Sequence, residues 1–188
     1  ILGLLPWIIM ALIFLIITAS IYLIYQKRKG NLQKHKIFSM FILILLFCWL
    51  IIVFGITTLS RGANYENMIN LSMFSGYINA WNKWSLSEFQ LIIFNIIMFI
   101  PLGLLLPLYN NKFKRFIPTF LVSLGVTLGI ECIQLATNMG IFELDDIFHN
   151  TLGGIIGFFL TIGILDCIEN KKIILKSIYF FIKKYILT

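Results

Sequence analysis

Long apolar runs alternate with short polar segments along most of this chain. The hydrocarbon core of a bilayer is roughly 30 Å thick, which requires about 20 apolar residues in a helix. Five runs have that length: Leu4–Tyr25, Ile37–Leu59, Phe89–Tyr109, Phe116–Thr137 and Ile147–Ile168. The first is too long for the apolar part of a signal peptide. The pattern predicts an all-α polytopic membrane bundle of five transmembrane helices, with residues 1–188 forming a single membrane domain.

Composition and charge agree with this prediction. Hydrophobic residues make up 60% of the chain and charged residues 12%, which is typical of an integral membrane protein. Basic residues outnumber acidic ones by 15 to 8, but 13 of the 15 fall in the segments that the five runs place on one side. We therefore expect no nucleic-acid partner. The positive-inside rule predicts a multi-pass cell-membrane protein with its N-terminus outside and its C-terminus in the cytoplasm.

Two segments are expected to lie along the membrane surface. In residues 169–188, Lys172, Lys176 and Lys183 fall on one helical face, which predicts an amphipathic helix on the cytoplasmic leaflet; a frayed basic tail is the alternative. The outer segment Ser60–Glu88 is rich in aromatic residues, which settle at the headgroup level. The three cysteines each lie within an apolar run and are predicted to be small buried side chains.

Polar side chains in the spans form the candidate site. An ionisable group at membrane depth costs several kcal/mol unless it meets a partner or water. Three of the predicted helices carry polar groups at a similar depth in the outer half of the membrane. These candidate binding residues are Asn95, Glu131, Gln134, Asp145, Asp146 and Asn150.

Glycines and a proline are expected to shape the packing around this site. Gly125 and Gly129 on the fourth span, and Gly153 and Gly157 on the fifth, predict close contact between those two helices. Pro101 should kink the third span.

Structural interpretations of the same residues stay open. Asp145 or Asp146 could serve as the N-cap of the fifth helix. Glu131, Gln134 and Asn95 could form a hydrogen-bonded network that holds three helices together. His149 could face the membrane interface, and a catalytic or ligand role for it is the less favoured interpretation.

Three motifs in fixed order resemble the VanZ-like family of bacterial membrane proteins. They are N-x-x-x-F-I-P-L-G from Asn95, E-x-x-Q from Glu131, and F-E-L-D-D-I-x-x-N-T-L-G-G-x-x-G from Phe142. The resemblance covers residues 61–159. Met73 stands where the family's upstream N-L-x-P-F element has proline, and Glu143 replaces the first aspartate of F-D-I-D-D.

The resemblance implies a cell-envelope protein of Gram-positive type that lowers susceptibility to teicoplanin, a lipoglycopeptide antibiotic. The expected partners are a membrane lipid, a lipid-linked cell-wall precursor or the antibiotic itself. No cofactor is predicted, and association into homo-oligomers stays open. The family implies no defined reaction, which leaves the catalytic residues unknown.

Two other functions are compatible with the sequence. One is a metal-dependent hydrolase or transferase acting on a phosphorylated lipid carrier, with Glu131, Asp145 and Asp146 holding Mg²⁺. This cluster has no clear nucleophile, and Arg61 and Lys83 are the only basic residues on its side. The other function is transport with Glu131 as a proton site, for which five spans without an inverted repeat are poorly suited.

Overall fold

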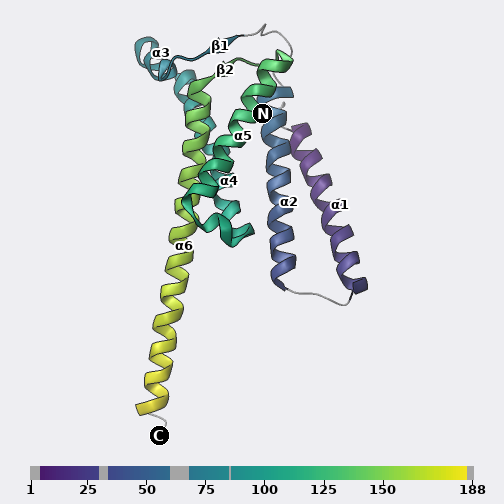
Figure 1. Cartoon of the computed structure of the whole chain (residues 1–188), viewed down its shortest axis with the longest axis vertical. Helices are drawn as coiled ribbons and strands as arrows, with labels where there is room; N and C mark the ends of the chain where they lie inside the picture. The colour runs from purple at the N-terminus through teal and green to yellow at the C-terminus, as the bar shows by residue number, and fades with distance from the viewer. Residues whose placement is uncertain (1–4, 30–33, 60–67, 85, 186–188) are drawn as a thin grey trace.

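Helices form nearly all of the structure, a computed structural model that describes residues 5–29, 34–59, 68–84 and 86–185 (Figure 1). The helices are α1 (Leu5–Lys29), α2 (Lys34–Phe54), the π-helix η1 (Gly55–Leu59), α3 (Ser75–Lys83), α4 (Leu86–Tyr109), the 3₁₀-helix η2 (Asn111–Lys114), α5 (Phe116–Thr137) and α6 (Leu144–Tyr185). Two short strands, β1 (Ile69–Asn70) and β2 (Phe142–Glu143), pair in parallel. The sequence pattern predicted neither strand.

Four described helical segments are long and apolar enough to cross a membrane: Lys36–Leu59, Phe89–Tyr109, Phe116–Thr137 and Leu144–Ile173. They correspond to the second to fifth predicted spans. The first predicted span is also helical, as α1, but its described apolar part, Ile9–Tyr22, is shorter than the other four. The all-α bundle and four of its five spans are thus confirmed at the level of helix length and composition.

The predicted C-terminal tail is not a separate helix. α6 continues without a break for 42 residues, a length of about 63 Å at 1.5 Å per residue, which is twice the thickness of the hydrocarbon core. Figure 1 shows α6 extending well past the ends of the other helices. As far as Tyr185, the expected tail 169–188 is thus a continuation of the last spanning helix, because no glycine or proline interrupts the helix near residue 169. Side chains of residues 174–185 lie outside the described part, so the amphipathic face stays a prediction.

Glycines allow α4 and α6 to pack backbone against backbone. A methyl group added to Gly153 would overlap the carbonyl of Ile96, and one added to Gly157 would overlap the carbonyl of Ile100. From the other side, a methyl group on Gly103 would overlap the carbonyl of Gly154. This contact is the most extensive between any two helices of the described structure.

The prediction that Gly125 and Gly129 bring α5 close to α6 is wrong. A methyl group on either glycine would meet no atom within 4 Å, and both positions are exposed. The small residue of α5 at the contact with α6 is Ser123, which lies against Gly154. A G-x-x-x-G spacing indicates that a face can approach another helix, but it does not say whether one does.

Side chains from neighbouring helices donate hydrogen bonds to carbonyls of α4 close to its two prolines, Pro101 and Pro107. Proline lacks an N–H and presses on the preceding turn, so it disrupts backbone hydrogen bonds there. Trp49 Nε1 donates to the carbonyl of Met98, three residues before Pro101, at 2.7 Å. Thr161 Oγ1 donates to the carbonyl of Leu104, three residues before Pro107, at 3.0 Å. Carbonyls that water cannot reach in a membrane are thus paired within the bundle.

α1 and α2 form a hairpin that joins the rest of the bundle mainly through α2 and α4. Cys48 is buried in this hairpin, and its Sγ donates to the carbonyl of Ala11 at 3.2 Å. The prediction of a buried cysteine is confirmed for Cys48 and wrong for Cys132 and Cys167, which are exposed. Those two lie on helix faces that point away from the bundle, where lipid is as apolar as a protein core.

Candidate functional site

Asp145 joins α6 to the start of α3. Its Oδ1 accepts a hydrogen bond from the N–H of Phe74 at 2.5 Å, and its Oδ2 accepts one from the N–H of Gly76 at 3.0 Å. Phe74 has a positive φ of 63°, an uncommon conformation for a large residue. A capping role was one of the two interpretations of Asp145, but these capping bonds lie on α3 and not on its own helix. The carboxylate therefore fixes a surface segment to the bundle.

Asp146 and Asn95 link the same end of α6 to α4. Asn95 Nδ2 donates to Asp146 Oδ1 at 2.6 Å, and both residues are half-buried. A hydrogen bond to a carboxylate is shorter and stronger than one between neutral groups. This contact brings Asn95 of α4 against one residue of the acidic pair, Asp146, and a binding role for the two stays a prediction.

Glu131 supports the two-stranded element. It is 1% exposed, and its Oε2 accepts a hydrogen bond from the N–H of Glu143 at 3.0 Å. The Glu143 side chain accepts in turn from Asn70 Nδ2 at 3.3 Å, across the β1–β2 pairing. A buried carboxylate on α5 thus holds the segment that leads into α6.

The side-chain amide nitrogens of Gln134 and Asn150 each donate a hydrogen bond, whereas the amide oxygens have no partner among the described residues. Gln134 Nε2 donates to the carbonyl of Thr57 in η1 at 3.1 Å, and Asn150 Nδ2 donates to Thr127 Oγ1 at 2.9 Å. Gln134 Oε1 and Asn150 Oδ1 are buried without a hydrogen-bond partner in the described part of the chain. A buried, unpaired polar atom is costly, so these two oxygens are sites where a water or ligand atom would be stabilised.

His149 is buried at this end of the bundle, more deeply than the sequence indicated. It is 1% exposed, its Nε2 lies 2.9 Å from the Tyr77 hydroxyl, and the two rings are 5.2 Å apart. The expectation of an interfacial histidine is wrong, because α3 covers it. Hydropathy could not reveal this contact, since Tyr77 lies 72 residues earlier in the chain.

The Tyr77 phenol should lose its proton at a higher pH than an ordinary tyrosine does. Burial, and then the negative charge of Asp145, raise the pKa of this phenol above its usual 10.0. The folded state therefore holds the Tyr77 proton more tightly than the unfolded state, and the resulting stability is lost as the pH rises above about 10. Subtracting the ultraviolet phenolate titration of Tyr77→Phe from that of the native protein should show one group with a raised pKa. A difference curve centred at 10 would contradict this expectation.

A row of buried polar side chains along α5 was not predicted from the sequence. Thr119, Ser123, Thr127 and Glu131 recur every four residues, and each is at most 1% exposed, whereas the outward face of α5 is apolar. Helices in membranes pack through small and polar residues because lipid leaves no hydrophobic drive between them. The i, i+4 spacing of hydroxyl residues ending at Glu131 was the signal available in the sequence.

The six predicted site residues gather at one end of the bundle, where they are engaged by different neighbours. They form separate contacts: Asn95 with Asp146, Glu131 with the β2 backbone, Gln134 with η1, Asp145 with α3 and Asn150 with α5. Neither of the two pockets described in the structure is lined by any of them.

The proposed arrangement of Glu131, Asp145 and Asp146 around one Mg²⁺ is not formed. Among the described residues, no group of three or more His, Cys, Asp or Glu side chains is placed to hold a metal ion. Both carboxylate oxygens of Asp145 already accept backbone N–H groups, and Glu131 faces the β2 backbone. The geometry therefore gives no support to a metal-dependent lipid phosphatase built on these three carboxylates.

Comparison with known proteins decides the family. The VanZ/LLP1 family model matches residues 38–166. The chain belongs to the VanZ/LLP1 family. It is also 30% identical, over 146 residues, to Protein VanZ of Enterococcus faecium, covering 76% of this chain and 81% of that protein. No solved structure matches the chain.

The VanZ/LLP1 match extends beyond the motifs that suggested it. It begins at residue 38, in α2, and so includes Trp49 and Thr57, the partners of Met98 and Gln134. The matched region contains the polar contacts made by Asn95, Asp145 and Asp146. It also contains Gly103, Gly153 and Gly157, which allow the close contact between α4 and α6. The protein is a multi-pass membrane protein of this family.

Proposed function

We propose that this VanZ/LLP1 protein lowers susceptibility to teicoplanin-type lipoglycopeptides by binding a lipid-linked or antibiotic head group at the polar end of its bundle. We place that end outside the cell, because 13 of the 15 basic residues fall in segments assigned to the other side. Family membership supports the link to the antibiotic. The arrangement of the acidic residues of α6 supports the location.

The observation that carries the proposal is the Asn95–Asp146 pair. Both residues are half-buried and so partly accessible, and half-buried Glu143 lies on β2 at the same end of the bundle; we call these three the rim residues. The other four predicted binding residues, Glu131, Gln134, Asp145 and Asn150, are at most 7% exposed. We therefore assign head-group contact to the rim residues and a positioning role to the buried ones.

The chemistry of this rim suits a polar, hydrogen-bonding head group. Carboxylate oxygens accept hydrogen bonds from hydroxyl, amide and ammonium groups, and the Asn95 amide both donates and accepts. Sugar hydroxyls and peptide N–H groups are such donors, and both cell-wall precursors and glycopeptides carry them. A bare phosphate fits less well, because the acidic residues of this end would repel it.

Asp146→Asn should abolish the effect on antibiotic susceptibility without unfolding the protein. Asparagine keeps an oxygen that can accept the bond from Asn95 Nδ2, but it removes the negative charge. In a susceptible Gram-positive host that expresses the protein, we expect the teicoplanin inhibitory concentration to fall to that of the empty host. Membrane abundance should stay at the native level.

Asp166→Asn is the matched control, because Asp166 is an exposed carboxylate on the same helix. It should keep the full effect. Native protein at verified abundance that leaves susceptibility unchanged would disprove the resistance role. A fully active Asp146→Asn protein would disprove head-group binding at the rim and leave the resistance role intact.

A further inference from the structure

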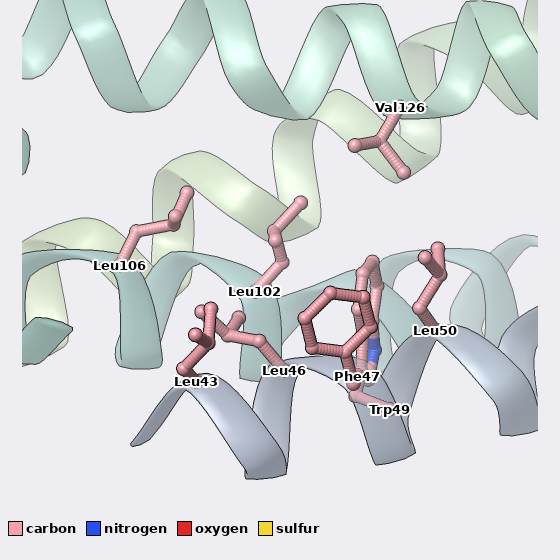
Figure 2. Close-up of a pocket in the computed structure, with 8 residues that line it drawn as sticks. All are labelled: Leu43, Leu46, Phe47, Trp49, Leu50, Leu102, Leu106 and Val126. Atoms are coloured by element: carbon pink, nitrogen blue, oxygen red, sulfur yellow. The ribbon is translucent and has the colours of Figure 1, made fainter. Parts of the chain in front are cut away.

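An apolar groove runs between α2 and α5, with α4 as its floor. It encloses about 170 Å³ and is lined by five residues of α2 between Leu43 and Leu50, by Leu102 and Leu106 of α4, and by Val126 of α5. Figure 2 shows these side chains converging from the three helices. Every lining side chain is hydrocarbon except that of Trp49, whose Nε1 is engaged by Met98.

A polar contact joins α5 to η1 beyond one end of the groove. α5 and η1 meet where Gln134 Nε2 donates to the carbonyl of Thr57, five or more residues beyond the last lining residue of α2. Val126 of α5 and the lining residues of α2 face the groove from opposite sides (Figure 2). The groove therefore runs from the Gln134 contact toward the opposite end of the bundle.

Basic side chains flank that opposite end on both walls. η2 begins five residues after Leu106, and its Phe113 packs against the apolar cluster that contains Leu102 and Leu106. Thr119 Oγ1 donates to the Phe113 carbonyl at 2.8 Å, which fixes the turn further. The exposed cations of this basic turn are Lys112, Lys114 and Arg115, and Lys36 is exposed on α2, seven residues before Leu43.

We propose that this groove and its basic end form a binding site for an anionic phospholipid. The groove lies within segments that cross the hydrocarbon region, so a single acyl chain is the occupant that matches its lining. None of the four cations forms an ion pair with a residue that the structure describes, which leaves them available for a lipid phosphate. Each Lys or Arg near an anionic surface contributes about 1 kcal/mol of attraction. This site is independent of the proposed antibiotic resistance and lies at the other end of the bundle.

Quenching of Trp49 fluorescence by brominated acyl chains tests the site. Trp7→Phe, Trp81→Phe and Trp84→Phe leave Trp49 as the single tryptophan of the four in the sequence. This variant is reconstituted in nanodiscs with brominated phosphatidylglycerol or, at the same mole fraction, brominated phosphatidylcholine. We expect phosphatidylglycerol to quench Trp49 more strongly. Lys112→Gln with Lys114→Gln should reduce this preference by about 30-fold.

Lys171→Gln with Lys172→Gln is the matched control, because it removes two exposed charges of α6. It should keep the preference. Equal quenching by the two lipids would disprove the head-group contact, and no quenching by either would disprove occupancy of the groove. If both double variants lost the preference equally, attraction to the whole basic surface would explain it and the site would be rejected. Comparing the quenching of Trp49 by the two lipids in the single-tryptophan protein tests the site even if a double variant fails to fold.

Discussion

Gly157→Ala should destabilise the protein by about 3 kcal/mol, near the upper end of what overpacking a core costs. The added methyl group would overlap the backbone carbonyl of Ile100 and press on the backbone of Gly103 and Leu104. Backbone atoms of a packed helix cannot rotate away as a side chain can, so α4 and α6 would have to separate. Unfolding in detergent, followed by size-exclusion chromatography after heating, should show a midpoint several degrees below that of the native protein.

Gly125→Ala and Gly129→Ala are the matched controls, because they make the same change where a methyl group meets nothing within 4 Å. Alanine favours a helix over glycine by up to about 1 kcal/mol, so neither should lower the midpoint. Gly154→Ala should fall between the two cases, since its methyl group would meet the Ser123 side chain and not backbone. Equal decreases of the unfolding midpoint in Gly157→Ala and Gly129→Ala would contradict a tight backbone contact between α4 and α6.

The elements that hydropathy could predict were those whose whole length is apolar. The run Phe116–Thr137 coincides with α5, and the run Phe89–Tyr109 ends where α4 ends, although α4 already begins at Leu86. A charged or polar loop follows each of these two helix ends. The end of the last span was harder, since Lys171 and Lys172 are compatible with helix and α6 simply continues past them. Charge marks where a helix leaves the membrane, whereas only a cap or a breaking residue marks where it ends.

Partners across the chain could not be predicted from spacing alone. The sequence brought Asn95 and the acidic pair to one depth, and the structure joins Asn95 to Asp146. It gave no indication that Asp145 would hold α3, which lies some 70 residues earlier. α3 has too few apolar residues to be read as a buried element, and its position depends on those backbone contacts.

The same limit explains the misassigned glycines. Periodicity identifies the face of a helix that carries small residues, and both glycine pairs satisfied it. Which of two such faces is used depends on the neighbouring helix, and α4 offers Gly103 against Gly154 and Gly157. Gly103 has no glycine four residues away, so no G-x-x-x-G spacing marks it in the sequence.

Asp145→Ala should release α3 from the bundle. The substitution removes both acceptors of the Phe74 and Gly76 N–H groups, and hydrogen bonds to a charged group contribute about 1.5–3 kcal/mol each. Hydrogen exchange measured by mass spectrometry should therefore accelerate at least about tenfold in peptides covering α3, with little change in α4 and α5. Asp145→Asn keeps one acceptor oxygen and should give a smaller increase.

Asp166→Ala, which removes an exposed carboxylate from α6, should leave exchange in α3 unchanged. Unaltered protection of α3 in Asp145→Ala would show that packing of Tyr77 on His149 holds this segment without the carboxylate. A uniform increase in all helices would instead make Asp145 a determinant of the whole bundle. The distinction bears on function, because α3 covers His149 and packs against α4, the helix that carries Asn95. If α3 alone is released and antibiotic susceptibility returns to that of the empty host at normal abundance, the binding surface must include α3 as well as the rim.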